Sequence, residues 1–280
     1  MIVFMYQLNV VSAAGGNATA VIIIPGKTWT PQQMSETGRS VQNSRRMVEL
    51  GVEQVGFLFP DESRFEMAGG EFCGNAARAA ALLLASPTST DPVSVEFRMS
   101  GFDGIVRGIV NPSQPGVDRY VTCQFPSLPL NISRRQLADG TTVQVVDLKG
   151  IVHILLEGRI PDGDNNRWER HRSIVTELDL NNREAVGVIW CRRQGNKLTI
   201  EPLVWVRDVD TFYFEQACGS GSIAAAAAYN LEAITQPTGQ DILVRFDRSD
   251  SQTTTVIESV MEVIGIEQYN QPTLDPTPLL

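Results

Sequence analysis

The sequence predicts an α+β fold of two pseudo-symmetric lobes, each a strand-rich shell around one central, buried helix. The stretches "EFCGNAARAAALLL" and "EQACGSGSIAAAAAYN" share one arrangement, a Cys-Gly pair directly before an alanine-rich run. Their cysteines, Cys73 and Cys218, are 145 residues apart (218 − 73), about half of the chain, which indicates duplication of one lobe rather than a short-period repeat. No charge occurs in 79–85 or 223–228, so neither helix has a face for solvent there, and each should be buried all round.

The N-terminal half begins with two strands and a helix. The strands are joined by the turn "SAAGGN". Thr30 suits the N-cap of the helix and Gln33 completes a capping box with it. The helix should end before Gly51. The elements expected here, in chain order, are strands at 2–11 and 19–25, a helix at 30–50, strands at 53–59 and 63–70, the first Cys-Gly helix to about 85, and strands at 93–101 and 104–110.

The C-terminal half repeats this order of strands and helices. The elements expected are strands near 119–125, 141–157 and 185–191, a helix near 169–181, strands near 197–206 and 211–215, the second Cys-Gly helix from 218 to 230, and strands at 241–247 and 253–268. We therefore expect an N-terminal lobe at 1–118 and a C-terminal lobe at 119–255. Residues 269–280 are Pro-rich without periodicity and are expected to be disordered.

Composition argues against several classes of partner. The 280-residue chain has a net charge of −9 and no basic stripe, which argues against nucleic acid. No apolar stretch approaches the ~18 residues of a membrane span. The start "MIVFMYQLNVVSAA" lacks a basic segment and is better interpreted as a strand than as a secretion signal. We expect a cytoplasmic protein whose four cysteines stay reduced.

The position of the two cysteines predicts acid/base chemistry. A helix N-terminus carries unpaired N–H groups and partial positive charge, which lowers the pKa of a nearby thiol from ~8.5 toward ~3.5 to 7.5. The same N–H groups, exposed by Gly74, Gly219 and Gly221, can hold a substrate carboxylate. If the lobes face each other, two thiols flank one small molecule. One can remove a proton from an α-carbon while the other returns it on the opposite face, which is racemisation.

Other roles for the cysteines fit less well. Cys123 and Cys191 have no such context and are expected to be small buried hydrophobes. A redox pair is disfavoured because the chain has no Cys-x-x-Cys. A metal site is disfavoured because His153, His171 and the scattered cysteines lack ligand spacing. "CGSGS" is an incomplete dinucleotide loop. We therefore expect no metal and no cofactor.

The two cysteine motifs resemble those of the diaminopimelate epimerase family of cofactor-independent amino-acid racemases. "GGN", "EQV" and "GIVH" also resemble family motifs, so the resemblance extends over nearly the whole chain. The resemblance implies two lobes, and it implies that the last strand, near 256–268, returns to the first lobe. It also suggests a homodimer. It also implies a small amino acid as substrate. The residues to which it assigns roles are Cys73 and Cys218 as the two bases, Asn17 and Gln54 as substrate contacts, and the backbone of Gly74, Asn75, Gly219 and Ser220 as the carboxylate site.

Departures from the family pattern bear on the substrate. Diaminopimelate epimerases have Glu-Arg where Val209 and Asp210 stand here, Met67 lies near the position of a substrate-binding Asn, and Ile151-Val152 replace Asn-Pro. These differences disfavour diaminopimelate.

"EQVGF", "EFCGNA" and "E..CGSG" are similar to the histidine racemase of staphylopine-type metallophore biosynthesis. This similarity implies a recognition or gating role for Glu53, whose alternative is a solvent-facing carboxylate. We expect a histidine racemase. The alternatives are a diaminopimelate epimerase, a racemase of another amino acid, a phenazine-biosynthesis-type isomerase with one carboxylate acid/base, and a non-catalytic amino-acid-binding protein.

Overall fold

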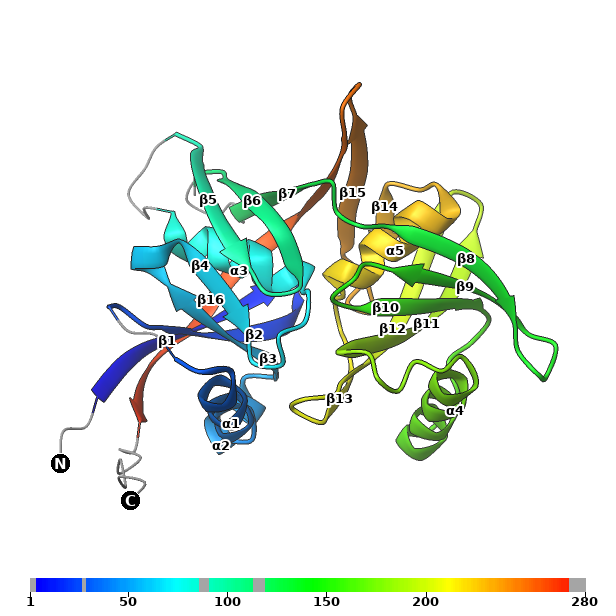
Figure 1. Cartoon of the computed structure of the whole chain (residues 1–280), viewed down its shortest axis with the longest axis horizontal. Helices are drawn as coiled ribbons and strands as arrows, with labels where there is room; N and C mark the ends of the chain where they lie inside the picture. The colour runs from blue at the N-terminus through cyan, green and yellow to red at the C-terminus, as the bar shows by residue number, and fades with distance from the viewer. Residues whose placement is uncertain (1–3, 27–28, 86–90, 113–118, 272–280) are drawn as a thin grey trace, which may run out of the picture.

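The strands of the protein form one continuous hydrogen-bonded path, seen in Figure 1 as two groups of strands, each beside one helix. The computed structural model describes residues 4–26, 29–85, 91–112 and 119–271. The class is mixed α+β, as predicted from the sequence. No helix among these residues is long and apolar enough to cross a membrane.

The first lobe contains seven strands from the N-terminal half and the buried helix α3. Its elements are β1 (Phe4–Ala13), β2 (Gly16–Ile23), α1 (Pro31–Gln42), α2 (Arg45–Glu49), β3 (Val52–Phe59), the 3₁₀ turn η1 (Pro60–Glu62), β4 (Arg64–Met67), α3 (Gly74–Leu84), β5 (Val93–Met99), β6 (Phe102–Val110) and β7 (Arg119–Pro126). The final strand, β16 (Thr253–Gln271), pairs with both β7 and β1. The eight strands therefore close into a ring, so β7 pairs within the first lobe, although the second lobe was expected to begin at residue 119.

The second lobe lies on the other side of β16 and stays open. Its elements are β8 (Asn131–Gln136), β9 (Thr142–Asp147), β10 (Val152–Glu157), α4 (Asp164–Glu177), β11 (Ala185–Gln194), β12 (Lys197–Val206), β13 (Thr211–Phe214), α5 (Gly219–Tyr229), β14 (Ala233–Thr235) and β15 (Asp241–Arg248). In the order β9-β10-β11-β12-β14-β15-β16, the β10–β11 and β12–β14 pairs are parallel and the other four pairs are antiparallel. The same order runs from β1 to β7.

Small side chains bring the strands close to the two central helices. In α3, residues 74–82 are all buried, and in α5, residues 219–226 are. A Cβ built on Gly108 of β6 would lie 2.5 Å from the Cβ of Ala81 in α3, so the strand touches the helix directly. Alanine and glycine at the contact therefore let the shell close around a helix that is buried on all sides along this stretch.

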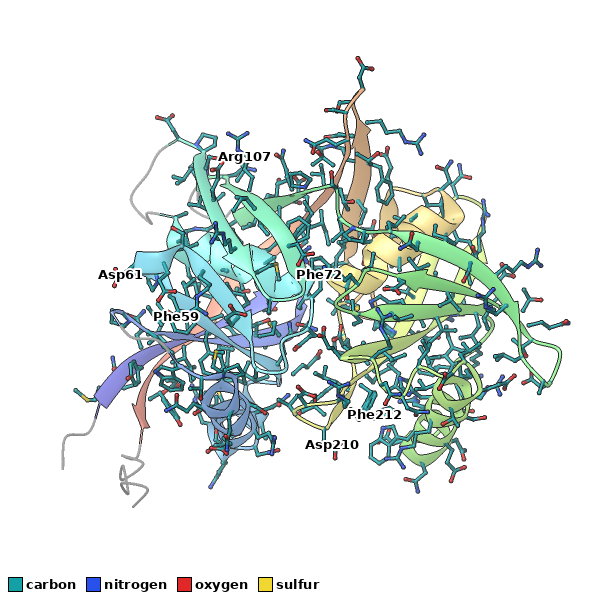
Figure 2. The ribbon with its side chains drawn as sticks, in the orientation of Figure 1. Phe59, Asp61, Phe72, Arg107, Asp210 and Phe212 are labelled. Atoms are coloured by element: carbon teal, nitrogen blue, oxygen red, sulfur yellow. The ribbon has the colours of Figure 1, made fainter. Side chains whose placement is uncertain are left out.

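One contact between the lobes lies beside the start of α3. Figure 2 shows Phe72 at the junction of the lobes, where its ring packs edge-on against Phe125 with 5.2 Å between ring centroids. A Cβ on Gly150 of the second lobe would lie 2.7 Å from the Cα of Gly101 and 2.9 Å from the Cβ of Phe72. This close approach fixes the segment that leads into Cys73.

Several expected elements differ in detail from the observed ones. The helix expected at 30–50 has the expected Thr30 capping box but breaks at Asn43 and Ser44, residues that favour caps over helix interiors. The strand expected at 141–157 is two strands, because the Asp147 carboxylate accepts the Lys149 N–H and forms a turn.

The remaining differences come from segments with a weak hydrophobic pattern. The helix expected at 169–181 is α4, which begins earlier, at Asp164, in a polar run without apolar periodicity. The short strands β8 and β14 were not predicted. Residues 269–271 of the segment expected to be disordered belong to β16, and 272–280 lie outside the described residues.

Candidate active site

The two motif cysteines occupy equivalent positions at the starts of α3 and α5. Cys73 is the N-cap of α3, and its Sγ accepts a hydrogen bond from the Ala76 amide at 3.4 Å. Cys218 is the N-cap of α5, and its Sγ accepts one from the Gly221 amide at 3.3 Å. Their backbone angles are nearly the same, φ −136° and ψ 114° against φ −126° and ψ 106°. Both side chains are buried.

The N-termini of the two helices meet each other. A Cβ on Gly74 would lie 3.1 Å from the Gly219 carbonyl carbon, and one on Gly219 would lie 2.8 Å from the Asn75 nitrogen. Only glycine allows this approach. The Asn75 side chain reaches across the junction and donates to the Ala217 carbonyl at 2.8 Å. The first-turn amides of both helices, which have no acceptor within their own helix, are thus gathered at one point.

Cys73 faces a chain of neutral amides. Its thiol donates to Gln54 Oε1 at 3.2 Å. The Gln54 Nε2 in turn donates to Asn17 Oδ1 at 2.7 Å and to Thr19 Oγ1 at 2.8 Å. Asn17 is buried, with a left-handed φ of 40°. Three residues predicted for the site, Asn17, Gln54 and Cys73, are therefore connected by hydrogen bonds.

Cys218 faces a carboxylate and a hydroxyl. Its thiol is hydrogen-bonded to the Glu215 side chain. Ser220 Oγ lies 3.8 Å from Cys218 Sγ and 2.9 Å from His153 Nε2. His153 is fully buried, and burial lowers its pKa to about 3, so the ring is neutral. A Cβ on Gly187 of the neighbouring strand would lie 2.3 Å from His153 Nδ1, so that glycine makes room for the imidazole.

The expectation of low thiol pKa values is wrong for this structure. Burial, with a contribution from the Glu215 charge, raises the pKa of Cys73 to about 12. Burial and Glu215, through its charge and its hydrogen bond, raise the pKa of Cys218 well above its ordinary value. The helix amides act in the opposite direction, as expected, but desolvation of the charged form is the larger effect. Both cysteines are therefore thiols here.

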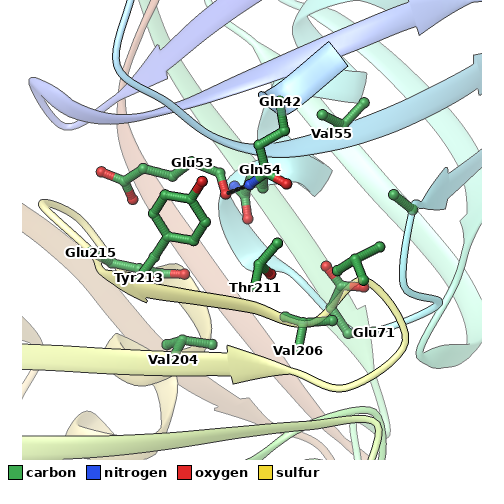
Figure 3. Close-up of a pocket in the computed structure, with 12 residues that line it drawn as sticks. Gln42, Glu53, Gln54, Val55, Glu71, Val204, Val206, Thr211, Tyr213 and Glu215 are labelled. Carbon is green, nitrogen blue, oxygen red and sulfur yellow. Dashed lines mark hydrogen bonds between the residues drawn. The ribbon is translucent and has the colours of Figure 1, made fainter. Parts of the chain in front are cut away.

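A pocket between the lobes adjoins both thiols through Gln54 and Glu215. Its cavity volume is about 20 Å³, and the pocket is partly open to solvent. The side chains around it are drawn in Figure 3; the lining residues are Gln42, Glu53, Gln54, Val55, Ala68, Glu71, Val204, Val206, Val209, Thr211, Tyr213 and Glu215. The described lining contains three carboxylates and no lysine or arginine.

The three carboxylates are held in conditions that favour their protonated forms. Burial raises the pKa of Glu71 to about 7 and that of Glu215 to about 7. Burial and the neighbouring Glu215 also raise the pKa of Glu53 well above its ordinary value. One oxygen of Glu53 and one of Glu71 are buried without a hydrogen-bond partner among the described residues. Such oxygens can accept hydrogen bonds from a ligand in the pocket.

A β-bulge directs Glu53 to the pocket. The parallel pairing of β2 and β3 matches Ala18 with Val52 and then Thr19 with Gln54, so Glu53 is the extra residue. In a regular strand, Glu53 and Gln54 would point to opposite faces, whereas here both line the pocket. The solvent-facing alternative for Glu53 does not hold, because the Glu53 carboxylate is turned inward and accepts from the Gln216 amide at 3.4 Å.

Two of the carboxylates were missed by sequence reasoning. Glu71 precedes Cys73 by two residues, and Glu215 precedes Cys218 by three. An acidic residue just before each motif cysteine is the signal that could have found them. The side chains of Asn75 and Ser220, in contrast, point to Ala217 and His153, so only their backbone is available for the predicted carboxylate site. Among the described residues, no group of three or more His, Cys, Asp or Glu is arranged to hold a metal ion.

Comparison with known proteins places this site in a family. Residues 29–266 match the family model described as the histidine racemase CntK N-terminal domain. The chain belongs to this family. It is therefore an enzyme of the amino-acid racemase and epimerase class. Two histidine racemases from strains of Fusobacterium nucleatum subsp. nucleatum are 28% and 27% identical, over 68% and 62% of this chain and 72% and 65% of their own.

Solved structures share the fold of this family member. A hydroxyproline epimerase from Agrobacterium vitis with bound trans-4-hydroxy-L-proline matches with a TM-score of 0.62 at 14% identity, covering 98% of this chain and 94% of that one. A probable proline racemase from Agrobacterium radiobacter also matches with a TM-score of 0.62 at 14% identity, covering 97% and 94%. A phenazine biosynthesis protein from Enterococcus faecalis matches with a TM-score of 0.54 at 14% identity, covering 95% and 99%.

Proposed function

We propose that the chain is a cofactor-independent histidine racemase in which Cys73 and Cys218 are two opposed acid/base groups. The observation that carries this proposal is the meeting of two helix N-termini, each capped by a buried thiol, beside one pocket. A single α-carbon held at that point would have a thiol on either face. Two-base racemisation needs this arrangement.

In the proposed reaction, the first-turn amides of α3 and α5 bind the substrate carboxylate. These include the backbone of Gly74, Asn75, Gly219 and Ser220. As the α-proton leaves, negative charge moves into that carboxylate, where the helix N-termini stabilise it. Asn17 and Gln54 hold the substrate from the first lobe.

In each turnover one cysteine removes the α-proton of the substrate, and the other cysteine donates its own proton to the opposite face. When Cys218 is the base, its own proton passes to the Glu215 carboxylate, to which it is hydrogen-bonded. The Cys218 thiolate then removes the α-proton, and the Cys73 thiol gives its proton to the opposite face. Cys73 ends as thiolate, Cys218 as thiol, and Glu215 keeps the first proton. In this state the site can act on the opposite enantiomer, with Cys73 as the base. It returns to its first state when Cys73 regains a proton from solvent and Glu215 loses one to solvent.

Histidine is proposed as the substrate because of the acidic pocket. Glu53, Glu71 and Glu215 can accept hydrogen bonds from an α-ammonium group and from imidazole N–H groups. Proline offers no side-chain donor to them. The distal carboxylate of diaminopimelate would meet these carboxylates without a lysine or arginine among the described lining residues. The two similar Fusobacterium proteins are histidine racemases, which supports the same substrate.

Proton exchange in D2O tests the proposal. The purified protein is incubated with L-histidine, L-proline, trans-4-hydroxy-L-proline or LL-diaminopimelate, and the α-proton signal is followed by NMR while chiral chromatography follows the enantiomer. Of the four amino acids, we expect only L-histidine to lose its α-proton signal and to form the D-enantiomer. Exchange with another amino acid but not histidine would contradict the substrate, and exchange with none would contradict the reaction.

The phenazine-type isomerase and the binding protein on the same fold are separated by the same assay. Activity that survives replacement of both cysteines would favour the isomerase with one carboxylate acid/base. Tight histidine binding in calorimetry without exchange in D2O would favour the binding protein. We expect neither outcome.

A further inference from the structure

Arg78 is a buried charge inside the first lobe. It is the one charged residue of α3, and its side chain is 0% exposed. Among the described residues, no other arginine or lysine is buried. It follows Cys73 by five residues, and the matching position of α5 is Ile223, also 0% exposed. The two copies therefore differ by one complete charge behind the thiols.

The guanidinium is only partly satisfied by hydrogen bonds. Its Nη2 donates to Asn75 Oδ1 at 2.5 Å, while Nε and Nη1 have no partner among the described residues. Burial lowers the pKa of Arg78 to about 10, so the group remains charged at neutral pH. A buried charge without a partner costs several kcal/mol of folding free energy. Packing alone would be served better by an apolar side chain such as that of Ile223.

The groups near Arg78 that can carry negative charge are mostly thiols. They are Cys73 at the start of α3, Cys123 on β7, Cys218 at the start of α5 and Glu258 on β16. The Glu258 carboxylate already accepts a hydrogen bond from the Thr122 hydroxyl.

The hydrogen bond from Arg78 also reaches the second thiol. Arg78 holds the Asn75 amide by its oxygen, which leaves the Asn75 nitrogen pointing across the junction to the Ala217 carbonyl, next to Cys218. One side chain is thus linked to both helix starts.

We propose that Arg78 is a positioning residue of the two-thiol site, which orients Asn75 across the helix junction and supplies the buried positive charge that balances a thiolate at Cys73 or Cys218. This inference rests on the proposed two-thiol reaction. It explains why a costly charge stands at this position in one copy alone.

Replacement variants separate the charge from the packing. Arg78→Met removes the charge and keeps most of the side-chain length, Arg78→Gln keeps an amide donor without charge, and Arg78→Lys keeps the charge. Ile223→Met is the matched control in the other copy. For each, we would measure the kcat of α-proton exchange, the thermal midpoint, and the pH dependence of iodoacetamide alkylation at each cysteine by mass spectrometry.

The expected results differ from those of a structural role. Arg78→Met should lower kcat by about 10- to 100-fold and raise the pH midpoint of alkylation of Cys73 and Cys218 by about one unit, because the opposite charge is lost. Its thermal midpoint should not fall, since an uncompensated buried charge has been removed. Arg78→Lys should restore the alkylation midpoint and most of kcat. Ile223→Met should match the original protein in kcat and alkylation.

Two results would overturn the inference. One is an Arg78→Met or Arg78→Gln protein with unchanged kcat and alkylation midpoints. The other is a loss of activity in all three Arg78 variants that follows a loss of thermal stability. If Arg78→Met does not fold, Arg78→Gln and Arg78→Lys decide by the same readouts. Alkylation does not require turnover, so absence of exchange in the original protein would contradict the proposed reaction without deciding the role of Arg78.

Discussion

The Cys73 and Cys218 sites have the same backbone but different surroundings. Both cysteines cap a buried helix with nearly equal φ and ψ, and both accept a hydrogen bond from the amide three residues on. The groups around the sulfur differ, however. The Cys73 thiol donates to the neutral Gln54 amide, whereas the Cys218 thiol is hydrogen-bonded to the Glu215 carboxylate and lies near Ser220. The duplicated backbone therefore supplies the position of each thiol, and the side chains decide where its proton can go.

The two thiols therefore start from unequal states. Only Cys218 has a neighbouring group that can both accept its proton and keep it nearby, because the pKa of Glu215 is raised by burial to about 7. Cys73 has no such acceptor among the groups that bond to its sulfur. We therefore expect the two cysteines to respond differently to substitution of their neighbours, although both are needed.

The largest effect should come from replacing either thiol. Cys73→Ser and Cys218→Ser should each lower the racemisation rate by about 10²- to 10⁴-fold, because a hydroxyl is a far weaker base than a thiolate. Chiral chromatography of histidine measures the rate. Cys191→Ala, which changes a buried thiol of the second lobe outside the pocket, is the control and should keep its activity. Full activity in either serine variant would remove that thiol from the reaction.

The next effect should come from making the Cys218 surroundings resemble those of Cys73. Glu215→Gln removes the charge that raises the pKa of Cys218, so its alkylation midpoint should move to lower pH, by about one unit. The rate of exchange should fall by about tenfold or more, because the thiol proton has lost its acceptor.

The shift of the alkylation midpoint in Glu215→Gln should differ in size between the two cysteines. Cys73 feels the Glu215 charge but makes no hydrogen bond to it, so its midpoint should move in the same direction by less. Gln54→Glu is the converse change and should raise the alkylation midpoint of Cys73. Equal shifts at both cysteines in Glu215→Gln would contradict a closer interaction of the Glu215 charge with Cys218 than with Cys73.

Sequence reasoning predicted the two buried helices better than the surroundings of the cysteines that cap them. The duplicated Cys-Gly motif and the uncharged runs behind it predicted two buried helices because local composition dictates burial. The raised thiol pKa values were not predicted, since desolvation depends on how closely the lobes approach, which no local pattern records. The inward turn of Glu53 depends on a bulge in strand pairing, and pairing register likewise comes from contacts distant in sequence.

A smaller effect should appear in the pH dependence of stability. Glu71 and Glu215 each have a folded pKa of about 7, above the ordinary value of 4.5. Each therefore contributes stability that is complete below about pH 4.5 and is lost as the pH rises through about 7. Glu71→Gln should become more stable relative to the original protein across this range, by about 3 kcal/mol, because glutamine does not ionise.

Chemical denaturation at pH 4.5, 6 and 8 measures this difference. His153 and His171 act in the opposite sense, since burial lowers the pKa of each and their contribution is lost as the pH falls below about 6.5. They are present in both proteins, so their contribution cancels in the difference. Glu215→Gln should give a similar curve. A difference that does not change with pH would contradict burial of these carboxylates in solution.

The smallest effect separates the two glycines at the helix junction. A methyl group on Gly219 would come within 2.8 Å of the Asn75 backbone nitrogen, whereas one on Gly74 would stay 3.1 Å from the nearest backbone atom. Backbone on both sides leaves little freedom to move, so Gly219→Ala should destabilise the protein more than Gly74→Ala, within a range of about 1 to 3 kcal/mol for overpacking.

Both glycine variants should also push the helix starts apart, which widens the distance between the thiols and lowers the exchange rate. Thermal unfolding and exchange in D2O measure the two effects together. A rate that falls in step with the loss of stability, and further in Gly219→Ala than in Gly74→Ala, is expected if the junction of the two copies holds the thiols at working distance. Destabilisation without any loss of rate would mean that the thiols are positioned by their own lobes and not by the contact between them.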